Sequence, residues 1–156
     1  VYTSVAQASS SMEVLGDVYG IRNGTTDDRN ITELRFTVVL TAGGSPVDFS
    51  TVTMTWSTPE NISSLDGDLN SDITDVIKSW CSAGNWTIIQ IDNPTNDQDD
   101  ALLENQEQFT ILVHLPDTNV LKPNEKFSLE IRPAIGTSYA IKRAAPSKID
   151  AVNALY

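Results

Sequence analysis

Apolar and polar residues alternate in several short stretches of this chain, and the clearest of them lie in its second half. Residues 109–115, FTILVHL, place an apolar side chain at every second position, and residues 127–132 repeat the pattern until Pro133. A weaker run, residues 139–142, follows Gly136. A period of two is typical of β-strands, and proline and glycine interrupt them. These residues therefore predict three short strands in an antiparallel meander.

Residues 11–91 contain four more stretches with strand character. Residues 34–40 alternate most clearly, while residues 52–56 and 86–91 are rich in the β-branched and aromatic residues that favour strands. Residues 11–21 also read as a strand, which we expect to bulge at one of its glycines. Residues 57–72 are polar and contain proline and glycine, so they predict a long loop.

One stretch breaks the period of two. In residues 71–80 the apolar side chains recur at i, i+3, i+4 and i+7, which is the spacing of an amphipathic helix. Ser71 or Asp72 is suited to cap its start. We expect a short helix that packs on the sheets.

Together these elements predict an all-β protein. Seven or eight short strands separated by turns fit an immunoglobulin-like antiparallel β-sandwich with one short helix. The Cys…Trp…Cys arrangement of antibody domains is absent, because the chain contains one cysteine. We find no internal repeat and no linker, so residues 1–156 form a single domain in this interpretation.

The charge excludes one class of function. The formal net charge is -11, and the ten Lys and Arg residues do not form one continuous cluster in the sequence. Such a surface repels phosphate backbones, so we do not expect nucleic-acid binding. An acidic surface also simply keeps a protein soluble. No stretch approaches the 18 apolar residues that a membrane-spanning helix needs, so we expect no membrane segment in this chain.

The second half carries an ordered series of features. Over residues 97–146 these are Leu102-Leu103, Glu107, the FTILVHLP strand, Leu121-Lys122-Pro123-Asn124, Phe127-Ser128-Leu129-Glu130-Ile131-Arg132-Pro133, Gly136, Ile141, Arg143 and Pro146. This series resembles the C-terminal half of archaeal flagellins (archaellins). Gln7-Ala8-Ser9-Ser10, leading on to Val14 and Gly20, is similar to the segment where the long N-terminal helix of an archaellin passes into its β domain. The similarity is weaker over residues 1–56 than over 97–146, and poor over 57–96.

The resemblance implies a structural protein rather than an enzyme. It implies a subunit of the archaellum, the rotating filament of archaea, which lies outside the cell and assembles from copies of the same protein. It also implies that residues 1–10 are the stump of an N-terminal assembly helix. The chain would then be a truncated ectodomain that stays monomeric or weakly associated alone. Candidate contact residues in the filament lie near the two ends: Val1, Tyr2, Val5 and Tyr156.

One loop has the composition of a calcium site. Residues 92–100 hold four carboxylates and three amides, and hard oxygen ligands in a flexible loop suit Ca²⁺. Our hypothesis is a structural Ca²⁺ bound by Asp97 and Asp99 with Asp92 or Asp100, and the existence of metal-binding archaellins favours it. The alternative is a solvated acidic loop. A second acidic stretch, residues 66–72, lacks the glycine and glutamate of an EF-hand.

Four sequons match the acceptor pattern for N-glycosylation. They begin at Asn23, Asn30, Asn61 and Asn85. A chain this rich in Ser and Thr also produces sequons by chance. Because archaellins are commonly N-glycosylated, we expect at least two of the four to carry a glycan.

Catalytic and zinc chemistry find little support in the sequence. Cys81 and His114 are the only cysteine and histidine, so no zinc cluster can form from them. We interpret Cys81 as a structural thiol and His114 as an outward-facing strand residue. The alternative function is a cell-surface adhesin or carbohydrate-binding β-sandwich that uses Trp56, Trp80 and Trp86 as a sugar platform. Trp56 and Trp86 lie on expected core faces, where packing is the commoner role.

Overall fold

The computed structural model describes residues 11–22 and 29–156, and these residues form strands and loops. The strands are β1 (Met12–Ile21), β2 (Glu33–Leu40), β3 (Val47–Asp48), β4 (Thr53–Ser57), β5 (Ile62–Gly67), β6 (Asn85–Asp92), β7 (Leu102–Leu103), β8 (Gln108–His114), β9 (Lys126–Arg132), β10 (Tyr139–Ala144) and β11 (Val152–Leu155). Nine of them form one sheet in the order β10-β9-β4-β5-β6-β8-β2-β1-β11, while β3 and β7 pair separately. No helix in the described ranges is long and apolar enough to cross a membrane.

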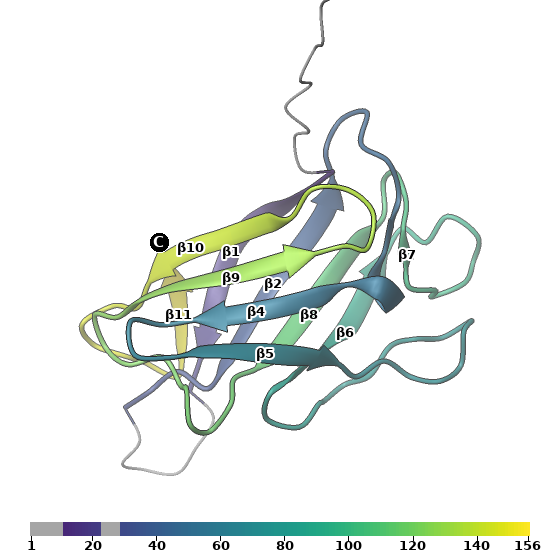
Figure 1. The fold of residues 1–156 in the computed structure, drawn as a ribbon. Helices are drawn as coiled ribbons and strands as arrows, with labels where there is room; N and C mark the ends of the chain where they lie inside the picture. The colour runs from purple at the N-terminus through teal and green to yellow at the C-terminus, as the bar shows by residue number, and fades with distance from the viewer. Residues whose placement is uncertain (1–10, 23–28) are drawn as a thin grey trace, which may run out of the picture.

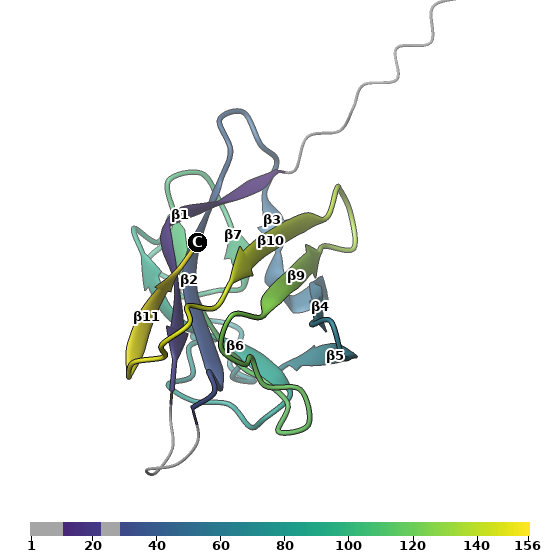
Figure 2. The ribbon, with the colours of Figure 1, turned by 90° about the vertical axis from the view of Figure 1, so that its left-hand side faces the viewer.

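The nine-stranded sheet folds over into two layers. Strands β10, β9, β4 and β5 form one layer, and β6, β8, β2, β1 and β11 form the other (Figures 1 and 2). The layers join where β5 and β6 pair in parallel, with Asp66 opposite Asn85 and Gly67 opposite Trp86. At the other edge the Ala144 N–H donates to the Tyr156 carbonyl over 2.9 Å. The predicted β-sandwich is confirmed.

Aromatic residues from both layers fill the space between them. The Phe49 ring meets the rings of Trp86 and Phe109 edge-on, at centroid distances of 6.1 and 5.3 Å. The Trp56 ring lies 5.0 Å from that of Phe127. Buried aromatic residues remove a large apolar area from water and dominate the energetics of small cores. Trp56 and Trp86 are fully buried, as their strand faces predict.

The bulge predicted in the first strand is present. The pairing of β1 with β2 shifts between Leu15 and Tyr19, and Gly16 there has a φ of 77°, in the left-handed region that favours glycine. Met12 and Val18 are both buried, while Leu15 and Tyr19 on either side of the shift are exposed. β1 therefore accommodates two more residues than β2 between these pairs.

The predicted helix over residues 71–80 is wrong. The helical element in the described part of the chain is a 3-10 turn, Phe49–Thr51. The Asp72 carboxylate accepts hydrogen bonds from the Thr74 N–H and hydroxyl, at 3.0 and 2.8 Å, and these bonds lower the pKa of Asp72. This local turn competes with helix formation.

The backbone of the same segment is paired with a neighbouring loop. The Val76 N–H donates to the Asp99 carbonyl over 2.8 Å, and the Asp99 N–H donates to the Thr74 carbonyl over 3.1 Å. Of the supposed apolar face only Val76 is buried, whereas Ile73 is 82% exposed. Tertiary hydrogen bonds to a loop more than twenty residues away outweighed the local periodicity.

The loop predicted over residues 57–72 is only partly correct, because β5 lies within it. This strand pairs with β4, yet Leu65 is its only buried side chain. Its last residue, Gly67, approaches the buried Trp86 ring so closely that a Cβ there would lie 2.9 Å from Trp86 Cζ2. The apolar pattern also fails to predict β11, a strand of only four residues.

A buried carboxylate holds the turn before β8. Glu107 is 1% exposed, and its carboxylate accepts a 2.8 Å hydrogen bond from the Glu104 N–H. Removal from water raises the pKa of Glu107, and hydrogen bonds from the backbone of Glu104 and Thr95 oppose this effect. The side chain therefore ties the turn to the 92–100 loop at the cost of burying a charge.

This burial predicts a pH dependence of stability. Because the folded-state pKa of Glu107 lies above its usual 4.5, the folded protein holds this proton more tightly than the unfolded chain does. The resulting stabilisation is complete below the usual value and is lost as the pH rises through the folded-state value. Glu107→Gln keeps an acceptor for the Glu104 N–H without the charge. We expect its melting temperature, relative to the parent, to improve from pH 4 to pH 7.

Glu107→Ala provides the matched comparison, because it removes the acceptor as well as the charge. We expect it to lower the free energy of unfolding by about 1–3 kcal/mol, the usual cost of leaving a buried donor unpaired. Thermal and urea unfolding followed by circular dichroism measure both effects. Parallel pH curves for the parent and Glu107→Gln would contradict the assignment.

Candidate assembly surfaces and loop sites

Several large apolar side chains remain exposed on the described surface. They are Leu15, Tyr19, Ile62, Ile73, Trp80, Ile135, Val152 and Tyr156. Tyr156 was expected as a contact residue, and it is 81% exposed. Val1, Tyr2 and Val5 lie outside the described residues. Residues 1–10, expected as a helical stump, do so too.

A groove lies beside Tyr156 on the outer face of the β4–β9–β10 layer. Strand pairing places Ser57 opposite Ser128, and Ser128 opposite Lys142, so two small side chains lie in a row next to a long one. Pro59 and Tyr156 add apolar walls to a hollow of about 460 Å³. The sequence analysis missed this groove, because it depends on which strands pair.

Three cations line the groove: Lys126, Lys142 and Arg143. Arg143 is partly fixed, since its Nη1 donates to the Leu155 carbonyl over 3.3 Å. At the rim of the same end, Lys122 is paired with Glu60 over 2.6 Å, which raises the pKa of Lys122. We call Ser57, Ser128, Lys126, Lys142, Arg143 and Tyr156 the basic groove.

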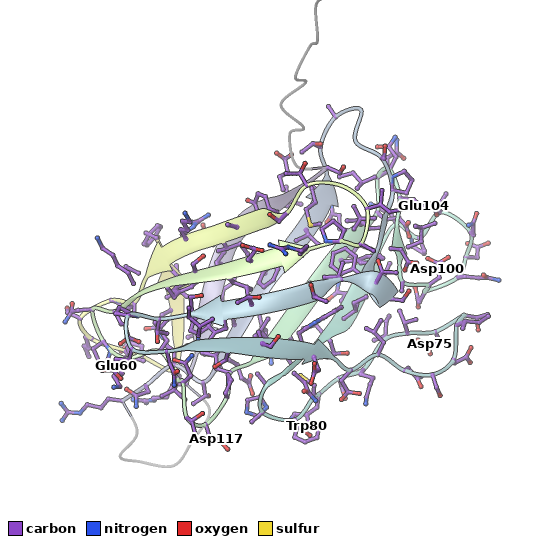
Figure 3. All side chains as sticks on the ribbon, in the orientation of Figure 1. Glu60, Asp75, Trp80, Asp100, Glu104 and Asp117 are labelled. Carbon is purple, nitrogen blue, oxygen red and sulfur yellow. The ribbon has the colours of Figure 1, made fainter. Side chains whose placement is uncertain are left out.

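Acidic loops lie at the opposite end of the sandwich. Asp75 and Asp99 form a parallel β-bridge, which places the loop after β5 beside the loop after β6. Figure 3 shows Asp75, Asp100 and Glu104 at this end, away from the chain terminus marked in Figure 1. We call residues 66–76 and 92–104 the acidic loops.

The residues expected to bind calcium lie in the acidic loops, but their side chains have separate roles. Asp92 accepts two hydrogen bonds from the Gln90 amide, at 2.9 and 3.1 Å, and Asp100 accepts one from the Leu102 N–H over 3.1 Å. Asp97 is exposed with a φ of 53°, and Asp99 pairs through its backbone. Within residues 11–22 and 29–156, no three His, Cys, Asp or Glu residues are grouped to hold a metal ion. The calcium site stays a prediction.

The four sequons differ in accessibility. Asn61 is exposed in the turn between β4 and β5, where its carbonyl accepts a hydrogen bond from the Thr58 N–H over 2.9 Å. Asn30 and Asn85 are half-buried, and Asn23 lies outside the described residues. Thr87, which completes the sequon at Asn85, is fully buried within β6.

Cys81 and His114 form a structural pair. Burial raises the pKa of the Cys81 thiol to about 11, so the thiol stays protonated at neutral pH. His114 Nδ1 lies 2.8 Å from the Cys81 carbonyl, which fixes the ring. His114 is half-buried rather than fully outward-facing.

Of the three tryptophans considered as a sugar platform, only Trp80 is accessible, at 58% exposure.

Comparisons with known proteins agree with the resemblance noted in the sequence. The family model described as archaeal-type flagellin matches residues 1–143. Probable flagellin 1 of Archaeoglobus fulgidus is 33% identical over 159 residues, which cover 99% of this chain and 75% of that protein. Flagellins are a family of structural proteins.

Solved structures show the same fold. Archaeal flagellin FlaB1 from Methanocaldococcus jannaschii superposes with a TM-score of 0.74 and 15% identity, covering 94% of this chain and 97% of that one. The archaeal flagellum of Methanospirillum hungatei strain JF1 gives a TM-score of 0.61 and 18% identity, covering 96% and 72%. With the matching family model and the curated relative, the conclusion is that this chain belongs to the archaeal-type flagellin family.

Proposed function

We propose that this protein is a structural subunit of an archaellum filament and that the β-sandwich forms part of the outer surface of the filament. The observation that carries this proposal is the family match over residues 1–143. The fold shared with a chain of the Methanospirillum hungatei flagellum supports it. In this role the protein works mechanically, outside the cell, by contacting copies of itself.

The architecture suits such a role. A helical filament requires heterologous contacts, in which one surface of a subunit meets a different surface of the next. The sandwich presents different chemistry at its two ends, with the basic groove at one and the acidic loops at the other. Its core is held by aromatic packing between the two layers, and nine of the described strands form one hydrogen-bonded sheet.

Deletion of the gene in its archaeal host tests the proposal. We expect the cells to lose filaments that antibodies against this domain label on the parent strain, and to lose swimming in soft agar. Re-expression of the gene should restore both. Labelled filaments that persist in the deletion strain, or a parent strain whose filaments the antibodies do not label, would contradict the proposal.

We also propose that the acidic loop 92–100 binds a structural Ca²⁺ through Asp97 and Asp99 with Asp92 or Asp100. Calcium takes six to eight oxygen ligands, so the loop must rearrange to bring these side chains together. Calorimetric titration of metal-stripped protein should give heat that disappears in the Asp97→Asn, Asp99→Asn double variant. Absence of heat, with no change in melting temperature on adding calcium, would end the hypothesis.

A further proposal concerns glycans on at least two of Asn23, Asn30, Asn61 and Asn85. Asn61 is the best acceptor among the described residues, because it is exposed in a turn. Peptide mass mapping of protein from its native source should find a modified Asn61, and Asn61→Gln should lower the intact mass by one glycan. An intact mass equal to that of the bare polypeptide would refute glycosylation.

A further inference from the structure

We propose that the basic groove of one subunit receives the acidic loops of a second copy of this chain, so that β-sandwiches contact one another end to end. This inference rests on the proposed function, because it names the surfaces through which filament subunits would meet. The two surfaces are defined by Lys126 and Lys142 on one side and by Asp75 and Asp99 on the other.

The first argument is that charge is segregated along the fold. Residues 66–107 contain ten Asp and Glu residues and one Lys, whereas residues 122–148 contain six Lys and Arg residues and two Glu. Strands of both segments span the sandwich, but the acidic loops lie at one end and the start of β9, where Lys126 stands, lies at the other (Figures 1 and 3). A chain with a strongly negative total charge therefore still offers a local positive surface.

The second argument is that the groove cations have no carboxylate partner within the described chain. Five other cations form ion pairs: Arg35 with Glu33, Lys78 with Asp68, Lys122 with Glu60, Arg132 with Glu130 and Lys148 with Asp150. Among the described residues, Lys126 and Lys142 form none, and Arg143 donates to a backbone carbonyl. The positive charge of the groove is thus available to a partner.

The acidic loops carry an excess of negative charge. Lys78 is the only cation between residues 66 and 107, and it is paired with Asp68 over 2.7 Å. Asp75, Asp97 and Asp99 have no ion pair among the described residues, and Asp75 and Asp97 are exposed. Bringing the two ends of neighbouring subunits together would offset the mutual repulsion of these carboxylates.

The shape of the groove favours a polypeptide partner. Its walls include Pro59 and Tyr156, and Ser57 and Ser128 leave room between the lysines. The acidic loops present apolar Ile73 beside Asp72 and Asp75. A second copy therefore supplies both the negative charge and an apolar side chain. Since the two surfaces lie at opposite ends, the contact is heterologous, and each subunit keeps a free surface for the next one.

Cross-linking in assembled filaments tests the contact. The double variant Lys142→Cys, Asp75→Cys is expressed as the full protein in the archaeal host, and isolated filaments are treated with a flexible bismaleimide. We expect a ladder of dimers, trimers and larger species on denaturing gels. Each single variant should remain monomeric, because a head-to-tail contact brings together two different positions. The parent supplies the background, since Cys81 is buried.

Three outcomes of this experiment would overturn the inference. The first is the absence of a ladder from filaments of the double variant. The second is an equal ladder from a matched control in which Thr53→Cys, an exposed residue of β4, replaces Lys142→Cys. Dimers from Asp75→Cys alone would also contradict it, because they indicate a two-fold contact. If the parent protein forms no filaments, the proposed function itself fails, which distinguishes the two failures.

Charge reversal gives an independent measurement. Lys126→Glu, Lys142→Glu makes both surfaces negative, and Asp75→Lys, Asp99→Lys places positive charge at the two loop positions that would face the groove lysines. We expect each variant alone to yield at least about tenfold fewer filaments, because like charges then face each other, and co-expression of the two to restore the yield. Each double change shifts the formal net charge of -11 by four, so both variants stay negative. Normal assembly by either variant alone, or no recovery on mixing, would contradict the contact.

The change of four charge units has its own control. Lys122→Glu, Arg132→Glu changes the net charge by the same amount as the groove variant but alters two exposed cations outside the groove. We expect this variant to assemble at close to the parent yield. A loss equal to that of the groove variant would show that total charge matters rather than the proposed contact. Circular dichroism melting curves establish that every variant folds.

Discussion

The two-layer structure depends on the close approach of Gly67 to Trp86. At this point β5 and β6 pair in parallel over two residues, and the sheet passes from one layer to the other. The indole ring occupies the space where any larger residue at position 67 would place its Cβ. The same ring also packs against Phe49 in the core. Trp86 therefore connects the place where the sheet passes between the layers with the aromatic centre of the core. A larger side chain at this position would push the layers apart and loosen both.

Strands with a period of two and strong apolar faces could be predicted from the sequence. β8 and β9 each bury every second side chain or more, so burial and pattern agree. β5 could not be predicted, because it buries only Leu65 and is held by backbone pairing with β4. Residues 71–80 failed for the opposite reason. Their spacing matches a helix, but their hydrogen bonds go to Asp99 and to the Asp72 side chain.

Of the two candidate surfaces, one could be predicted from the sequence and the other could not. The acidic loops are visible in the sequence, because their carboxylates are consecutive or nearly so. The basic groove is not, since Lys126 and Lys142 become neighbours only through the pairing of β9 with β10. Likewise the sequence groups Asp92 with Asp100. In the structure, however, Asp92 accepts a hydrogen bond from the Gln90 amide, and Asp100 accepts one from the Leu102 N–H. The composition therefore predicts where negative charge lies, but it does not predict whether the carboxylates converge on a metal ion.

The pairing of β1 with β11 has a consequence for how the protein is made. Asn153 donates to the Gly20 carbonyl across 133 residues of sequence. β1 can therefore pair with β11, one of its two neighbours, only after nearly the whole domain has left the ribosome. Contacts between distant parts of a chain form slowly, and unpaired strand edges invite aggregation in the meantime. The edge of β1 that β11 covers is therefore open to other chains during most of the synthesis of this domain.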